Sequence, residues 1–178
     1  MKLKTVLLIF SAAIASSSPA IVPNSGGNVG DSSIEEVRML PPGSDIPGQN
    51  TLNLCKGEHS HDAVVIDQVD FIPNPPKKGQ SLTVAAAGTV TEAIVPGAVV
   101  EVKVHFIGSQ IYHHKFDICD ELGRLGHKCP LESGQYHFNK TFDVPKKVPH
   151  GTYQLWAGAK LPNGHAITCI DGKIKVDR

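Results

Sequence analysis

Apolar and polar residues alternate along several short stretches of the chain after residue 50. The stretch 99–106 is the clearest case: Val100, Val102, Val104 and Phe106 alternate with Glu101, Lys103 and His105. A period of two places one set on a buried face of a β-strand and the other set in solvent. The same period recurs in 82–90, 136–144 and 153–161.

Three further stretches complete the predicted strands. In 64–71 the alternation slips near Asp67, which indicates a β-bulge. The stretch 166–176 reads as one strand, or as two with a break at Asp171-Gly172, and residues 51–56 supply the first strand. Ile111–Leu122 is the one segment whose pattern is ambiguous between strand and helix.

Turn signals such as PNPPKKG, VPG, VPHG and PNG separate these stretches. About seven short strands joined by regular turns predict an all-β fold. We therefore expect an immunoglobulin-like, two-sheet antiparallel β-sandwich.

The inward-facing sets mix large side chains with very small ones, namely Ala86, Gly88, Ala157 and Ala159. The side chains of two sheets must meet across about 10 Å, so small residues on the inner faces leave space between them. Ordinary sandwiches also carry inward Ala and Gly, which is the alternative. Strand phase gives the following expected lining of an apolar cavity: Leu82, Val84, Ala86, Val102, Val104, Phe106, Phe138, Phe142, Tyr153, Leu155 and Ala157.

The N-terminal third differs from the rest. Residues 1–15, MKLKTVLLIFSAAIA, combine a basic start, a short apolar run and small residues, which is typical of a secretory signal peptide cleaved near 15–20. A buried N-terminal helix is the alternative. Residues 16–49 are rich in Ser, Gly, Pro and Asn and read as a flexible arm or pro-segment. Residues 50–178 form the predicted domain, and its compartment is the secretory pathway, the extracellular space or a vacuolar or lysosomal lumen.

The length of the chain and its balanced charge indicate a single domain without a strongly basic surface. The 178 residues suit one domain, and 17 basic residues balance 17 acidic ones. Without Lys2 and Lys4 the balance becomes 15 against 17. No basic surface for nucleic acid is expected.

Four cysteines, Cys55, Cys119, Cys129 and Cys169, suit an oxidising compartment. Four cysteines allow three connectivities, and the sequence alone does not choose among them. Cys119 and Cys129 flank a Gly-rich stretch that can close as a local loop, which would leave Cys55 to Cys169. No C-x-x-C spacing favours zinc, so no metal site is expected.

Motifs of catalysis are missing from the sequence. It contains no G-x-S-x-G elbow, no H-E-x-x-H and no P-loop, so we expect neither an enzyme nor a cofactor. His59, His61 and the pair His113-His114 read as solvated loop histidines, with pH sensing as the alternative. Asn139-Lys140-Thr141 is an N-glycosylation sequon on the polar face of its strand.

The order of several segments over most of the chain after residue 45 resembles a known family. These segments are IPGQNTLNLC (46–55), VDFIPNPPKKGQSLTVAAAGTV (69–90), GAVVEVKVHF (97–106), ICDELGRLGHKCPLESGQ (118–135), DVPKKVPHGTYQL (143–155) and NGHAITCIDGKIKV (163–176). The sequence resembles the Niemann-Pick C type-2 protein family, whose module is the ML lipid-recognition domain. Within that family it is most similar to fungal phosphatidylglycerol/phosphatidylinositol transfer proteins. The PNPP-x-x-G turn and the order of the four cysteines are the most specific parts.

The resemblance implies a lipid carrier. It implies a seven-stranded sandwich with an apolar tunnel between the sheets, and the disulfides Cys55–Cys169 and Cys119–Cys129. It implies sterols as ligands of animal members and anionic phospholipids as ligands of fungal ones, with transient contact with membrane surfaces. The sequence lacks the early extra cysteine pair of the animal members, which weakens a transfer of sterol specificity.

Two apolar segments are candidates for the mouth of the tunnel. They are Ile94, Val95 and Pro96, and Ile111 and Tyr112, with His113, His114 and Lys115 beside them to meet anionic head groups. The expected protein is a monomer. The competing function is a secreted immunoglobulin-like module that recognises a protein or a glycan through its loops.

Overall fold

The computed structural model describes residues 44–124 and 126–178. Each stretch with a period of two forms a β-strand. The described elements are β1 (Leu52–Leu54), β2 (Val64–Ile72), β3 (Ser81–Val90), β4 (Val99–Phe106), β5 (Ser109–Asp117), α2 (Ile118–Arg124), β6 (Gly134–Asp143), β7 (Gly151–Lys160) and β8 (Ala166–Val176).

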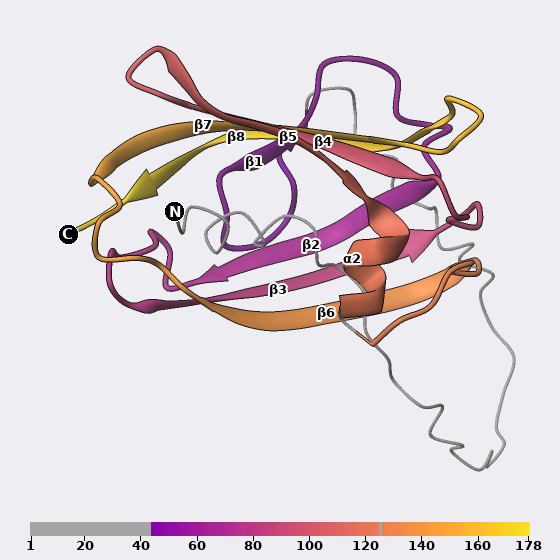
Figure 1. Cartoon of the computed structure of the whole chain (residues 1–178), viewed down its shortest axis with the longest axis horizontal. Helices are drawn as coiled ribbons and strands as arrows, with labels where there is room; N and C mark the ends of the chain where they lie inside the picture. Colours follow the sequence, from indigo (N-terminus) through magenta and orange to yellow (C-terminus); the bar gives the residue numbers. More distant parts are fainter. Residues whose placement is uncertain (1–43, 125) are drawn as a thin grey trace, which may run out of the picture.

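Two antiparallel sheets face each other (Figure 1). The larger sheet has the order β1-β8-β7-β4-β5, and the smaller sheet has the order β2-β3-β6. Most of the buried apolar residues lie between them, among them Phe71, Val102 and Leu155. The predicted all-β sandwich is therefore confirmed, with eight strands in the described part of the chain instead of about seven.

The eighth strand comes from the ambiguous segment. Residues up to Asp117 pair with β4 as strand β5, and the chain then turns into the short helix α2. The Asp117 carboxylate accepts a hydrogen bond from the backbone N–H of Asp120 at 3.1 Å, so Asp117 caps this helix. Ile118 and Leu122 are four residues apart and share the face of the helix that points into the sandwich.

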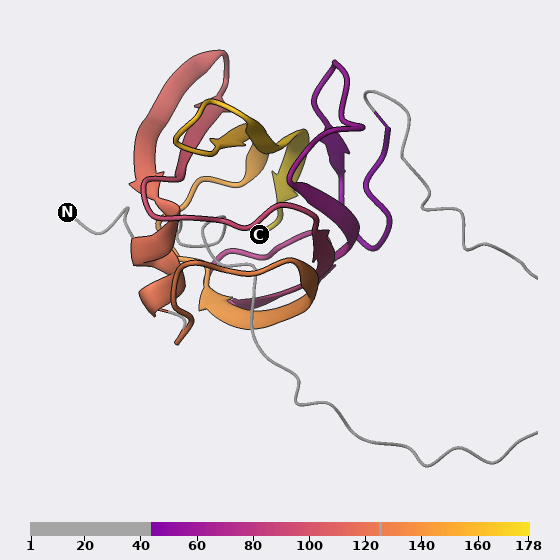
Figure 2. The same ribbon diagram turned by 90° about the vertical axis from the view of Figure 1, so that its right-hand side faces the viewer.

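Helix α2 closes one side of the sandwich. It lies between β5, an edge strand of the larger sheet, and β6, an edge strand of the smaller sheet (Figures 1 and 2). The Cys119–Cys129 disulfide ties the helix to the segment that leads into β6. The sheets are therefore bridged along this side by a covalently fixed helix.

The remaining strand details follow the sequence closely. The register of β2 against β3 shifts between Ile66 and Gln68, which confirms the bulge at Asp67. Strand β8 runs without a break through Asp171 and Gly172. Both disulfides implied by the resemblance are present, with Cα–Cα distances of 5.4 Å for Cys55–Cys169 and 5.6 Å for Cys119–Cys129.

The described chain begins inside the segment assigned to the flexible arm. Residues 44–49 pack on the domain instead: Ile46 is 4% exposed, and its N–H donates to the Leu52 carbonyl at 2.9 Å. Val69 and Phe71 donate their backbone N–H groups to the carbonyls of Pro47 and Gln49. The packed domain therefore starts earlier than residue 50, because this segment accepts hydrogen bonds from backbone N–H groups at the edge of β2 that would otherwise have no partner in the sheet. The predicted signal peptide and the rest of the arm lie outside the described residues.

In the part of the chain that the structure describes, no helix combines the length and the hydropathy needed to cross a membrane.

Candidate functional site

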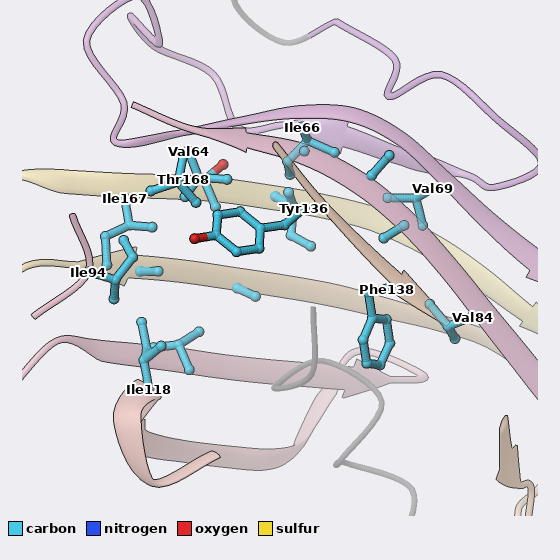
Figure 3. A pocket seen from close by; sticks show the side chains of 18 of the residues that line it. Val64, Ile66, Val69, Val84, Ile94, Ile118, Tyr136, Phe138, Ile167 and Thr168 are labelled. Atoms are coloured by element: carbon cyan, nitrogen blue, oxygen red, sulfur yellow. The ribbon is translucent and has the colours of Figure 1, made fainter. Parts of the chain in front are cut away.

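An apolar cavity of about 220 Å³ lies between the two sheets (Figure 3). Every sheet strand except β5 contributes to its wall, and so do α2 and the loop before β4. The lining residues are Leu52, Val64, Ile66, Val69, Phe71, Val84, Ala86, Ala87, Gly88, Val90, Ile94, Val100, Ile118, Leu122, Tyr136, Phe138, Ala157, Ala159, Ile167, Thr168 and Ile170.

Small side chains open this space. Ala86 and Gly88 on β3 belong to the smaller sheet, and Ala157 and Ala159 on β7 belong to the larger one. All four line the cavity. Facing residues of this size cannot fill the distance between two packed sheets, so a void remains.

The cavity occupies only part of the sandwich, toward the end where β6 and β8 begin and where β3 and β7 finish. Large side chains fill the other end. Leu82 pairs with Phe142 there, and the rings of Phe106 and Tyr153 stack with their centroids 4.5 Å apart. The inner faces are therefore tightly packed at one end and hollow at the other.

Strand phase identified inward residues but not their position along the sandwich. Four of the eleven predicted residues line the cavity: Val84, Ala86, Phe138 and Ala157. The other seven lie outside its wall, in the packed core or at the filled end: Leu82, Val102, Val104, Phe106, Phe142, Tyr153 and Leu155. A period of two gives the face of a strand and carries no information about distance along it.

Several lining residues were missed by the sequence analysis, for two reasons. Ile118 and Leu122 sit on α2, in the segment left ambiguous. The residues of β2 and β8, such as Val69 and Ile170, were recognised as strand residues but not placed opposite the small ones. The positions of Ala86, Gly88, Ala157 and Ala159 were the usable signal, because all four mark the hollow end.

The lining offers little chemistry beyond burial. Of its 21 residues, only Tyr136 and Thr168 carry a hydroxyl, and none carries a carboxylate, an amine or an imidazole. Tyr136 donates to the Glu132 carbonyl at 2.8 Å. The Thr168 hydroxyl is buried and has no hydrogen-bond partner within the described residues. The wall of the cavity therefore presents apolar surface with only two hydroxyl groups.

An empty cavity of this kind is unfavourable. At about 24 cal/mol per Å³, a void of this size costs about 5 kcal/mol. An unsatisfied buried hydroxyl such as that of Thr168 costs about 1–3 kcal/mol more. An apolar occupant would remove the larger penalty, which favours the cavity as the functional site of the molecule.

Comparison with known proteins shows the family of the chain. The sequence profile of the ML domain matches residues 49–176. The chain belongs to the ML-domain family. It is 33% identical over 133 residues to a phosphatidylglycerol/phosphatidylinositol transfer protein of Pyricularia oryzae, covering 75% of each chain. A protein of the same name from Yarrowia lipolytica is 30% identical over 180 residues, covering 96% of this chain and 95% of that relative. A solved Niemann-Pick type C2 protein from the Japanese carpenter ant superposes with a TM-score of 0.45 at 16% identity, covering 76% and 96% of the two chains.

The expected mouth residues of this ML domain lie in two different settings. Ile94 is only 2% exposed and lines the cavity itself, whereas Val95 and Pro96 beside it are exposed. Ile111 and Tyr112 belong to strand β5 and not to a loop, and neither lines the cavity. The backbones of Ile94 and Leu131 pair with each other, and the Ile94 side chain faces the cavity and not the solvent.

The basic residues of β5 point to both sides of the sheet. His114 pairs with Val102 and shares the inner face with Tyr112 and Phe116. His113 lies on the outer face, 2.6 Å from Glu101. This hydrogen bond, with Lys103 nearby, lowers the pKa of Glu101. Burial raises the pKa of Tyr112, and the carboxylate of Glu121 on α2 adds to the shift.

The segment before β2 links the two sheets of the ML domain. His59 lies between the Asp62 carboxylate and the Cys55 carbonyl, at 2.7 Å from each. Its side chain is 11% exposed, so the prediction of a solvated loop histidine was wrong for His59. Ala63, which is fully buried, bonds to Ala166 and Thr91 and so joins β8 and the end of β3. Among the described residues, no group of three or more His, Cys, Asp or Glu side chains could hold a metal ion.

Proposed function

We propose that this ML-domain protein is a lipid carrier that holds the apolar part of one lipid between its sheets and transfers it between membranes. The observation that carries the proposal is the hollow end of the sandwich, with its wall of aliphatic and aromatic side chains. A phospholipid such as phosphatidylglycerol or phosphatidylinositol is the leading ligand, because the relatives at 30–33% identity are named for these lipids. A sterol is the second.

Burial supplies the binding energy. Removing about 400 Å² of apolar lipid surface from water contributes on the order of 10 kcal/mol, at about 25 cal/mol per Å². A bilayer offers the lipid a comparable environment, so exchange between protein and bilayer is close to balanced. This balance is what a carrier needs, because it must release its ligand as well as take it up.

The lipid must widen the cavity when it enters. Ligand pockets commonly measure about 300–1,000 Å³, and the cavity is smaller at about 220 Å³. The polar head has no partners along the apolar wall, so it stays outside, near the loops of the hollow end. Val95 and Pro96, which are exposed next to the lining residue Ile94, are the candidates for contact with the bilayer.

The role needs no catalysis, no cofactor and no second copy of the chain. Passage through the secretory pathway follows from the predicted signal peptide at 1–15 and agrees with the two disulfides. The protein then acts outside the cell or in a vacuolar or lysosomal lumen, as a monomer.

Transfer between vesicles tests the proposal. Donor vesicles carry fluorescent phosphatidylglycerol, phosphatidylinositol or a sterol, and the rate of arrival in acceptor vesicles is measured with and without protein. Ala157→Phe places a ring in the cavity from the wall of β7. We expect at least a tenfold loss of transfer, with a stability change of about 1–3 kcal/mol from the added bulk.

The matched control is Gln154→Phe on the same strand. Gln154 is exposed and lies on the opposite face of β7, so the same ring is added outside the cavity. This variant should transfer lipid at the wild-type rate. If wild type moves none of the three lipids, and an organic extract of the purified protein contains no lipid by mass spectrometry, the carrier proposal fails. Recognition of a protein or a glycan through the loops then takes its place.

A further inference from the structure

A second hollow lies on the outer face of the smaller sheet, away from the cavity. It is a groove of about 560 Å³ that runs across β2, β3 and β6. Two rows of paired residues form it, Asp70–Ala85–Asn139 and Gln68–Ala87–His137. The central strand therefore contributes only methyl groups, and the two outer strands contribute polar side chains.

Alanine at these two positions is unusual for a strand. Strands favour β-branched and aromatic residues, and alanine is depleted in them. Thr83 and Thr89 occupy the same face of β3 on either side of the pair. Their neighbours Ala85 and Ala87 leave a floor that is apolar and low, between two rims that are polar and higher.

The rim on β2 is held in place by hydrogen bonds. The Gln68 side chain donates to one carboxylate oxygen of Asp70 at 2.6 Å. The backbone N–H of Gln49 donates to the other oxygen at 2.6 Å. A rim that is already ordered loses little conformational entropy when a ligand binds to it.

The rim on β6 contains the N-glycosylation sequon. Asn139 begins the sequon Asn139-Lys140-Thr141, and both Asn139 and His137 are exposed. Neither side chain has a hydrogen-bond partner within the described residues. The Thr141 hydroxyl lies 2.9 Å from that of Thr83, so the third residue of the sequon is fixed to β3 in the folded protein.

We propose that Asn139 carries an N-linked glycan whose first sugar lies in this groove. A pyranose ring has a face of C–H groups, which matches the methyl floor of Ala85 and Ala87. Its hydroxyl and acetamido groups lie at the ring edge, where they meet Asp70, Gln68 and His137. Because the glycan is attached at the rim, its effective concentration at the floor is high, and weak contacts suffice to seat it.

The test uses the full chain secreted from a yeast host that adds N-glycans. Mass spectrometry of the peptide that contains Asn139 measures occupancy. An endoglycosidase then trims the glycan to a single N-acetylglucosamine, and the melting temperature is compared with that of Asn139→Gln. A seated first sugar should raise the melting temperature by about 3 °C. Nuclear Overhauser effects should connect the sugar protons to the Ala85 methyl group.

Two variants distinguish the contact of the first sugar with the groove from the attachment of the glycan to Asn139. Ala85→Tyr fills the floor of the groove and should keep glycan occupancy while abolishing the difference in melting temperature. Thr89→Tyr places the same ring on the same face of β3 outside the groove, and the difference should persist. The proposal is overturned if the secreted protein carries no glycan at Asn139. It is also overturned if the single sugar neither shifts the melting temperature nor shows contacts with Ala85, a measurement on wild type that does not depend on how either variant folds.

Discussion

His59 is held between two groups that can only accept hydrogen bonds. Its Nδ1 faces the Asp62 carboxylate and its Nε2 faces the Cys55 carbonyl. A neutral imidazole has one N–H, so it satisfies one of these acceptors, whereas the protonated ring donates to both. Burial lowers the pKa of His59, but the hydrogen bonds to Asp62 and Cys55 outweigh it and raise the pKa above 6.5.

The raised pKa of His59 makes stability depend on pH. A proton bound more tightly by the folded state stabilises that state fully below the unfolded pKa of 6.5, and the contribution disappears as pH rises through the folded pKa. His59→Gln should therefore lower the free energy of unfolding by about 1.5–3 kcal/mol at pH 5.5 and by less at pH 8.5. Urea titrations at both values measure it. His61→Gln, at an exposed position two residues away, is the control. If His59→Gln lowered the free energy of unfolding equally at both pH values, the raised pKa of His59 would not be the cause.

At the scale of the strand, three of the four edge strands, β1, β2 and β6, are each protected in a different way. Strand β1 has only three residues, and residues 47–49 bond to the edge of β2, which also carries the bulge at Asp67. On β6, Lys140 falls between Phe138 and Phe142 on the inner face and is exposed at the edge. Short edges, bulges and inward-pointing charges all discourage pairing with another chain.

Strand β4 provides the test of strand phase. Val102 has no exposed surface, whereas its neighbour Lys103 reaches solvent over the Trp156 ring, with Nζ 4.5 Å from the ring centroid. Val102→Asp buries a carboxylate without a partner and should cost more than about 4 kcal/mol. Lys103→Gln removes a half-exposed cation that pairs with Glu101 at 3.1 Å, and it should cost less than about 1 kcal/mol. Thermal or urea unfolding measures the stability of both variants. Similar losses in the free energy of unfolding would mean that Val102 and Lys103 do not face opposite sides of the sheet.

The alternation of apolar and polar residues predicted the strands well and the cavity lining only in part. The two-residue period set the face of β3, β4, β6 and β7, because alternation follows directly from backbone geometry. It could not place α2, since seven residues are too few to show a helical period. It also could not tell the hollow end from the filled end. That difference depends on which small residues of one sheet lie opposite those of the other, which is a property of tertiary packing.

At the scale of the whole molecule, the two disulfides close loops of very different length. Cys55 and Cys169 are 114 residues apart in sequence, and Cys119 and Cys129 are 10 apart. Loop-closure entropy predicts a stabilisation of about 5 kcal/mol for the long loop and about 3 kcal/mol for the short one.

Paired substitutions measure these contributions. Cys55→Ala with Cys169→Ala should lower the free energy of unfolding by more than Cys119→Ala with Cys129→Ala. Removal of the short bridge should instead act on α2, and amide hydrogen exchange should quicken there before it quickens in the sheets. If the short bridge proved the more stabilising of the two, chain entropy would not be the main source of their effect.

The long disulfide also determines what happens to a cut chain. Of all the residues that line the cavity, only Leu52 and Ile170 lie outside the segment that Cys55–Cys169 encloses. A protease that cleaves the tip of the β4–β5 hairpin, where Ile107 is 84% exposed, produces two fragments that remain one covalent molecule. Both halves of the cavity wall stay joined after such a cut, so a protein with a cleaved backbone still keeps its cavity within one covalent molecule.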